Sequence, residues 1–196
     1  FNDYLKRVPE DPDALSLAGY SYMYSGQTDK ALEKIDKLMQ IADESADSQT
    51  KFTALLLRAE CQQLSEQLQQ ALDSLDEAGT IKTNDDYYSL LGDIHYDLGN
   101  HSESIKAYEQ LAAIAADVAY PHVQNVYNYL ALEDVPSAYE AAEKALALEP
   151  ENVEAVTALG NIYGWETKYR KAYAFFQQAV EIDPEYATGH VNSMWA

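Results

Sequence analysis

The residues that could catalyse a reaction or bind a metal are few and scattered in this chain. The histidines are His95, His101, His122 and His190, and no two of them are three or four residues apart. That spacing would place two imidazoles on one helix face as metal ligands. The sequence therefore predicts no metal site, and we expect His95 to be packed or hydrogen bonded inside the fold.

The single cysteine, Cys61, is expected to be a poor nucleophile. It follows Glu60 directly, and a neighbouring carboxylate disfavours the reactive thiolate. One cysteine excludes an intramolecular disulfide and a zinc cluster built from cysteines. The sequence contains no glycine-rich phosphate loop, no Gly-x-Ser-x-Gly motif and no His-Glu-x-x-His motif. We therefore expect no catalytic residue, no cofactor and no enzymatic activity.

The charge of the chain narrows the classes of partner. It has 33 acidic and 13 basic residues, which gives a formal net charge of −20. Such a charge repels nucleic-acid phosphates and anionic lipids. No apolar run approaches the roughly 18 residues that a membrane span needs. Nucleic acid and direct membrane insertion are therefore not expected. The acidity itself has two explanations, solvation of outward helix faces or recognition of a partner.

The elements that carry these residues follow a fixed period. Pro150 and Pro184 are 34 residues apart, and the same ladder of small and aromatic residues precedes each of them. In the last clear unit, 153–186, the ladder residues at places 7, 8, 11, 20, 24, 27 and 32 are Leu159, Gly160, Tyr163, Ala172, Phe176, Ala179 and Pro184. Small residues at such places let neighbouring helices approach closely.

This spacing resembles the tetratricopeptide repeat (TPR), a helix pair repeated every 34 residues. The units are 12–45, 52–84, 85–118, 119–152 and 153–186, with partial units at 1–11 and 187–196. The second unit is one residue short and lacks the family's Gly, Tyr and Pro, so its register is open by one position. Residues 46–51 are expected to form an extended turn before it. The last segment, Ala187–Trp195, is either a partial repeat or a capping helix.

The resemblance implies an all-α fold, a right-handed solenoid of antiparallel helix pairs that forms one domain over 1–196. Local signals agree, because no stretch shows sustained alternation of apolar residues that would indicate a strand. Asp29, Ser104 and Pro136 are near the starts of second helices, and Gly26, Gly79 and Gly99 are near helix ends. Pro9 indicates that Phe1–Val8 ends a preceding helix. A targeting segment would then lie upstream, and localisation is left open, with the cytoplasm marginally favoured.

In this family the first helix of each pair lines a concave groove, which implies a set of partner-binding residues. The candidates are Tyr20, Tyr24, Leu57, Asp93, Tyr96, Asp97, Gln124, Tyr127, Asn161 and Trp165. Corresponding places also hold Leu56, Glu60, Asp86, Ser89 and Leu90. Tyrosine offers a large rigid surface and a hydroxyl donor to a partner. Ordinary packing between repeats is an equally open explanation for Tyr20, Tyr24, Tyr96 and Tyr127.

The groove places also predict the kind of partner. One TPR subclass grips acidic C-terminal tails with Lys, Arg and Asn at these places. Here no Lys or Arg occupies them, and Arg58 would do so only in a different register. We therefore expect an adaptor that binds a basic, apolar or tyrosine-complementary segment or helix of another protein. The stretch from Thr83 to Glu143, whose only Lys or Arg is Lys106, is the expected centre of binding.

Two other functions remain open on the sequence alone. The chain could be the substrate-recruiting arm of a larger enzyme, whose catalytic domain lies elsewhere in the intact protein. It could also be a structural homo-oligomer in which the terminal helices pack against a second copy.

Overall fold

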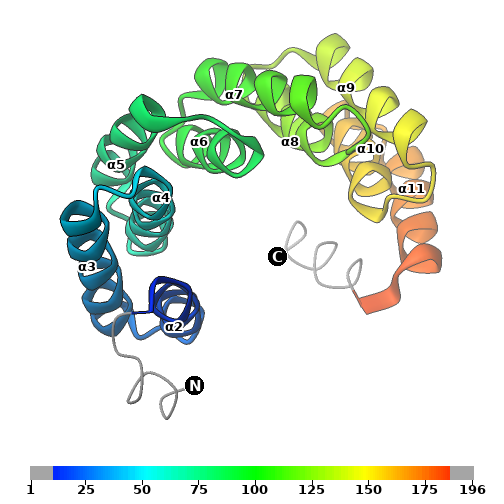
Figure 1. The fold of residues 1–196 in the computed structure, drawn as a ribbon. Helices are drawn as coiled ribbons and strands as arrows, with labels where there is room; N and C mark the ends of the chain where they lie inside the picture. Colours follow the sequence, from blue (N-terminus) through cyan, green and yellow to red (C-terminus); the bar gives the residue numbers. More distant parts are fainter. Residues whose placement is uncertain (1–10, 186–196) are drawn as a thin grey trace. The chain divides into compact units, whose positions relative to one another are not determined.

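A computed structural model describes residues 11–185, and within this range the only regular elements are α-helices (Figure 1). The helices are α2 (Pro12–Tyr24), α3 (Thr28–Ser45), α4 (Ser48–Leu64), α5 (Leu68–Ile81), α6 (Asp85–Asp97), α7 (His101–Ile114), α8 (Tyr120–Ala131), α9 (Val135–Leu148), α10 (Val153–Trp165) and α11 (Tyr169–Ile182). The predicted all-α helical repeat fold is confirmed. The helices expected at Phe1–Val8 and Ala187–Trp195, and His190, lie outside the described residues.

The helices form two compact units, Phe1–Leu98 and Gly99–Ala196. The boundary falls in the turn between α6 and α7. The repeat at 85–118 therefore contributes its first helix to unit 1 and its second helix to unit 2. The prediction that all of 1–196 forms one domain stays a prediction.

Unit 1 is built from the pairs α2–α3 and α4–α5, followed by α6. The first helices of successive repeats are neighbours, since α2 contacts α4 and α4 contacts α6 (Figure 1). One buried cluster includes Leu15, Ile35 and Leu57, and a second includes Phe52 and Tyr87. Each repeat thus completes its core against the next one, as expected for a stacked array.

The junction before α4 differs from the predicted extended turn at 46–51. The helix α4 already begins at Ser48, so only Ala46 and Asp47 separate it from α3. Ala46 takes a left-handed backbone with φ of 52°, and the Asp47 carboxylate accepts hydrogen bonds from the backbone N–H groups of Gln49 and Thr50. An aspartate at this position satisfies N–H groups that the first helical turn leaves unpaired. A single capping residue therefore replaces the longer turn.

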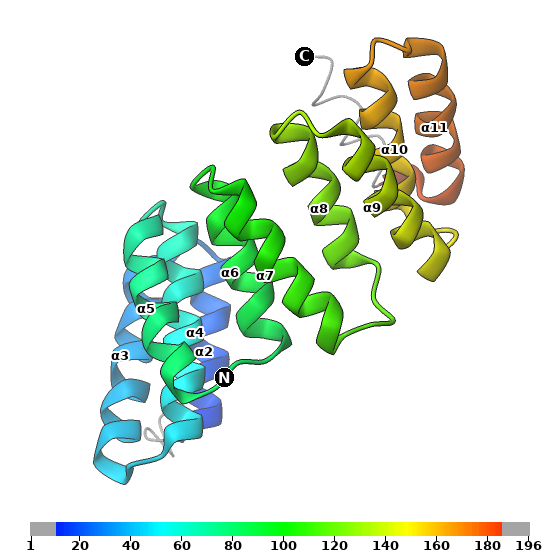
Figure 2. The same ribbon diagram turned by 90° about the horizontal axis from the view of Figure 1, so that it is seen from above.

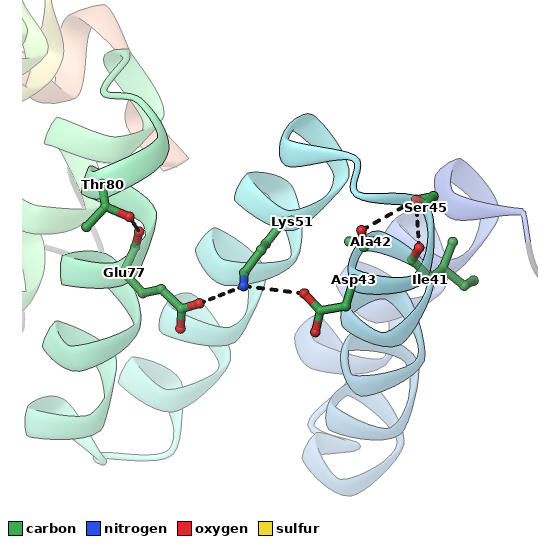
Figure 3. A network of polar contacts seen from close by, with 7 residues as sticks. All are labelled: Ile41, Ala42, Asp43, Ser45, Lys51, Glu77 and Thr80. Atoms are coloured by element: carbon green, nitrogen blue, oxygen red, sulfur yellow. Dashed lines mark hydrogen bonds and ion pairs between the residues drawn. The ribbon is translucent and has the colours of Figure 1, made fainter.

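Lys51 links three helices near this junction. Its Nζ lies 3.3 Å from Asp43 Oδ1 of α3 and 3.0 Å from Glu77 Oε1 of α5 (Figure 3). These contacts raise the pKa of Lys51, with the hydrogen bond to Glu77 first among the causes. Because all three side chains are partly exposed, solvent screens these ion pairs and they contribute little to stability. The two contacts connect α4 to α3 on one side and to α5 on the other.

Unit 2 contains α7, followed by the pairs α8–α9 and α10–α11, and each helix contacts the next along the chain (Figure 2). Its main buried cluster includes Val126, Ala142 and Ile162. Between α10 and α11, a Cβ placed on Gly160 would lie only 2.4 Å from Cε1 of Phe176. The absence of a side chain at Gly160 is therefore what lets these two helices approach.

The turn inside each repeat supports one register for all five units. Each turn contains one residue with a left-handed backbone, at the fifteenth place of its unit; these residues are Gly26, Glu66, Gly99, Glu133 and Thr167. Glu66 occupies this place in the second unit, whose register the sequence leaves open. The left-handed residue of this unit therefore lies at the same place as in the other four, and the bounds 52–84 stay a prediction.

Asn128 is the centre of a buried polar network in unit 2. Its side chain is fully buried, Nδ2 donates to Ser104 Oγ at 2.9 Å and to the Gln124 carbonyl at 3.2 Å, and Oδ1 lies 3.1 Å from His101 Nδ1. These bonds connect α7 to α8. A buried polar group costs free energy unless it is paired.

Replacing Asn128 with alanine is expected to lower the free energy of unfolding by about 1–3 kcal/mol, because the buried hydrogen bonds that its side chain donates to Ser104 and to the Gln124 carbonyl are lost. Urea unfolding followed by circular dichroism measures this change. The control is Gln110→Ala, at an exposed position on α7, which should change stability by less than about 0.5 kcal/mol. Equal effects of the two substitutions would contradict a stabilising role for the network.

Candidate partner-binding groove

A groove of about 280 Å³ lies on the first helices of unit 1. The residues that line it are Tyr20 and Tyr24 from α2, Leu56 and Glu60 from α4, and Asp86, Ser89, Leu90 and Asp93 from α6. Each of these residues has another lining residue three or four positions away on its own helix, which places them on one helix face. The stacking of repeats then aligns the three faces side by side.

The two tyrosines supply the aromatic part of the groove. Their ring centroids are 6.5 Å apart with 10° between the ring planes, and the side chains are 39% and 70% exposed at Tyr20 and Tyr24. The Tyr24 hydroxyl donates a hydrogen bond to the Glu60 carboxylate, which ties α2 to α4. Rings held in this way offer a surface that loses little conformational freedom when a partner binds.

Both phenols stay neutral near physiological pH. The hydrogen bond to Glu60, followed by burial, raises the pKa of Tyr24 to about 12. Burial, followed by the negative charges of Glu60 and Asp86, raises the pKa of Tyr20. The nearby carboxylates add to both shifts, since a negative charge opposes the formation of a phenolate.

The charge lining the groove is entirely negative. Glu60, Asp86 and Asp93 contribute carboxylates, and none of the lining residues is Lys, Arg or His. Arg58, the one basic residue considered for a groove position in another register, instead pairs with Asp36 of α3, with 3.0 Å between Nη2 and Oδ1. An anionic ligand would meet repulsion here, whereas a cationic group would find acceptors from two helices.

The structure brings together only some of the candidates in unit 1. Tyr20, Tyr24 and Asp93 line the groove, whereas Tyr96 and Asp97 lie farther along α6 and are not among its lining residues. Asp97 accepts a hydrogen bond from Gln63 Nε2 at 2.7 Å, which connects α6 to α4. Tyr96 is 38% exposed.

Leu57 is a correction to the predicted site. Its side chain is fully buried in the core cluster of α2, α3 and α4, so it offers no surface to a partner. Its neighbour Leu56 lines the groove instead. Successive residues of an α-helix point about 100° apart, and this rotation takes Leu57 from the groove into the core.

The remaining candidates lie in unit 2, on α8 and α10. Gln124 and Tyr127 are half-buried, and Tyr127 packs against the core clusters of this unit, as the packing alternative expects. Asn161 is 9% exposed, and its Oδ1 has no hydrogen-bond partner among the described residues. Trp165 is 54% exposed. These four candidates offer amide, phenol and indole groups.

A second, smaller hollow in unit 2, of about 100 Å³, was not predicted from the sequence. It lies among α7, α8 and α9 and includes the buried Asn125, His122, Tyr129 and the ion pair of Lys144 with Glu140, whose Nζ and Oε1 are 2.8 Å apart. Burial, followed by the charge of Lys144, lowers the pKa of His122. Cationic and anionic groups alternate here, so the hollow favours no single class of ligand.

The groups examined for catalysis show ordinary packing. Cys61 is buried in the core of unit 1, and burial, followed by the charge of Glu60, raises the pKa of its thiol. Among residues 11–185, no three His, Cys, Asp or Glu side chains are grouped so that they could hold a metal ion. In the same range, none of the helices combines the length and the apolar character that crossing a bilayer requires.

Comparisons with known proteins agree with this repeat architecture. A family model described as Tetratricopeptide repeat matches residues 85–118 and 153–186, the bounds of two units read from the sequence. No curated protein matches the chain significantly.

Solved structures with the same fold are numerous. MamA from Desulfovibrio magneticus RS-1 is 15% identical over 89% of this chain and 96% of its own, with a TM-score of 0.71. YrrB is 15% identical over 98% of this chain and 97% of its own, with a TM-score of 0.64. A protein from Parabacteroides merdae is 16% identical over 88% of this chain and 67% of its own, with a TM-score of 0.72. The repeated period, the stacked helix pairs and the family match agree: the chain has the fold of tetratricopeptide repeat proteins, and its residues 85–118 and 153–186 match the repeat itself.

Proposed function

We propose that this chain is a non-enzymatic scaffold for protein–protein interaction that binds a segment of a partner protein in the groove on α2, α4 and α6. Members of this family are generally interaction scaffolds without enzymatic activity. The structure of YrrB is described as a TPR protein with an unusual peptide-binding site, which supports a peptide as the class of ligand.

The observation that supports this groove most strongly is its composition. Two exposed tyrosines and two leucines provide apolar contact area, and three carboxylates and a serine provide acceptors, all within one face of three adjacent helices. Aromatic residues in a hollow surrounded by polar groups are typical of sites that dominate binding energy at interfaces.

The charge of the groove favours a basic partner segment. Carboxylates such as Asp86 and Asp93 would accelerate the encounter with a positively charged peptide, and the aromatic contacts would slow its release. The overall charge of −20 adds to the same attraction over a longer range. An acidic tail is the ligand of the TPR subclass with Lys, Arg and Asn in its groove. Here it is disfavoured both by the carboxylates of the groove and by the overall negative charge.

Peptides selected from a random display library on the purified protein provide a probe for this proposal. Titration calorimetry should show that Tyr20→Ala weakens binding by about 1–3 kcal/mol at both low and high salt. Asp93→Asn should cost less and should reduce the salt dependence of the affinity, because it removes a screened charge contribution.

Two matched variants control for the type of substitution. Tyr173→Ala removes an exposed tyrosine of α11, and Asp73→Asn removes an exposed carboxylate of α5, and neither residue lines the groove. Both controls should leave the affinity unchanged. If the controls weaken binding and the groove variants do not, or if only Tyr127→Ala on unit 2 has an effect, the groove of unit 1 is not the binding site.

A further inference from the structure

We infer that the groove on α2, α4 and α6 recognises an arginine side chain of the partner, held by Glu60, Asp86 and Asp93 against the ring of Tyr20. This inference rests on the proposed function and specifies the chemistry of its ligand. The occupant is a protein segment whose anchoring residue is arginine, in preference to lysine or to an uncharged residue.

The distribution of acceptors favours a planar cation with several donors. The carboxylates come from two helices, Glu60 from α4 and Asp86 and Asp93 from α6, so they approach a bound group from different directions. A guanidinium has five N–H donors in a fixed plane and can serve several carboxylates at once. The ammonium of lysine is compact and strongly hydrated, and it acts mainly as a point charge.

The rings of Tyr20 and Tyr24 also favour arginine over lysine. Tyr20 and Tyr24 have nearly parallel rings, 10° apart, and both rings are partly exposed. A guanidinium can lie flat on an aromatic face and still donate hydrogen bonds at its edges. The hydrogen bond from Tyr24 to Glu60 fixes the aromatic and the acidic parts relative to each other.

The size of the groove limits the occupant to a small anchor. At about 280 Å³ it is slightly smaller than the pockets of roughly 300–1,000 Å³ that hold drug-sized ligands. Leu56 and Leu90 can cover the methylene groups of a long side chain while the carboxylates take its charged end. One arginine with its neighbouring backbone therefore fits this site better than a bulky apolar helix face.

Three blocked amino acids test the inference without a known partner. N-acetyl amides of arginine, lysine and citrulline are titrated into the whole chain, and the ring resonances of Tyr20 and Tyr24 are followed by NMR. Arginine should bind at least about fivefold more tightly than lysine. Citrulline keeps the shape but lacks the charge, and it should cause no saturable change.

Variants separate the aromatic from the acidic contribution. Tyr20→Phe should preserve arginine binding, whereas Tyr20→Leu should weaken it about threefold or more. Glu60→Gln should weaken arginine binding although glutamine can still accept the Tyr24 hydroxyl. Glu44→Gln removes an exposed carboxylate from α3 and should have no effect. Equal losses for Glu44→Gln and Glu60→Gln would indicate general charge attraction and overturn the inference.

The outcomes distinguish this inference from the proposed function. If library peptides depend on Tyr20 and Asp93 but lysine and arginine amides bind equally, the groove binds a partner and the arginine preference is wrong. If the arginine amide shifts the tyrosine resonances but no peptide depends on the groove, the arginine site stands and the adaptor proposal for this groove fails. If the arginine amide causes no saturable shift, the arginine site is wrong.

Discussion

Replacing Leu57 with alanine is expected to lower the free energy of unfolding by about 2–5 kcal/mol. The side chain is fully buried among residues of α2, α3 and α4, so its removal loses apolar burial and leaves a cavity between two repeats. Because contacts in such an array are between neighbours, the loss should affect the whole of unit 1. Urea unfolding followed by circular dichroism measures it.

The adjacent residue provides the control for this prediction. Leu56→Ala removes the same number of atoms from a half-buried position that lines the groove, so it should cost less stability than Leu57→Ala. It should instead weaken the binding of selected peptides. A similar loss of stability for both variants, or a binding defect in Leu57→Ala under conditions where it remains folded, would mean that the assignment of core and groove faces on α4 is wrong.

Replacing Gly160 with leucine is also expected to destabilise the fold, by about 1–3 kcal/mol. An added Cβ would lie 2.4 Å from Cε1 and 2.7 Å from Cδ1 of Phe176, a ring that is only 4% exposed and cannot move aside freely. Leucine favours a helix by up to about 1 kcal/mol over glycine, and the overpacking should exceed this gain. The melting temperature should fall accordingly.

Gly164, one turn farther along α10, distinguishes crowding from a general effect of replacing glycine. A Cβ there has no atom within 4 Å, so Gly164→Ala should leave the melting temperature unchanged or raise it. The double variant Gly160→Ala with Phe176→Leu should recover part of the loss of Gly160→Ala, because the smaller side chain removes the close ring atoms. A stable Gly160→Leu protein would mean that α10 and α11 do not pack as described.

The sequence predicts the helices well because the packing of a helix pair restricts particular positions. Gly160 and Phe176 meet at one point of contact, and their types and spacing therefore repeat with the period of the structure. At positions outside such contacts the residue type is less restricted, so the sequence predicts their structure less well. Of the five left-handed residues in the turns, only Gly26 and Gly99 are glycines, and Glu66, Glu133 and Thr167 take the same backbone at a cost in strain.

The groove could be predicted only in part, for a different physical reason. Places on the first helices put Tyr20, Tyr24 and Asp93 on one face, because these places alternate regularly with the core, and all three line the groove. The sequence does not show which of Leu56 and Leu57 faces the groove. The answer depends on the rotation of α4 about its axis, and the two side chains are identical. The start of α4 at Ser48 depends on Asp47, whose side chain caps the helix. The sequence predicts an extended turn over 46–51 and does not reveal this cap.

The boundary between the two compact units, at Leu98 and Gly99, does not coincide with a boundary between repeats. A gene that grows by duplication adds whole 34-residue repeats, and its natural seams are the ends of the units, such as 84 and 118. The compact bodies instead part in the middle of the repeat at 85–118. Recombination at a repeat end would leave α6 and α7 together, whereas exchange of a whole compact body would divide them. The predicted repeats and the compact bodies of this chain therefore have different boundaries.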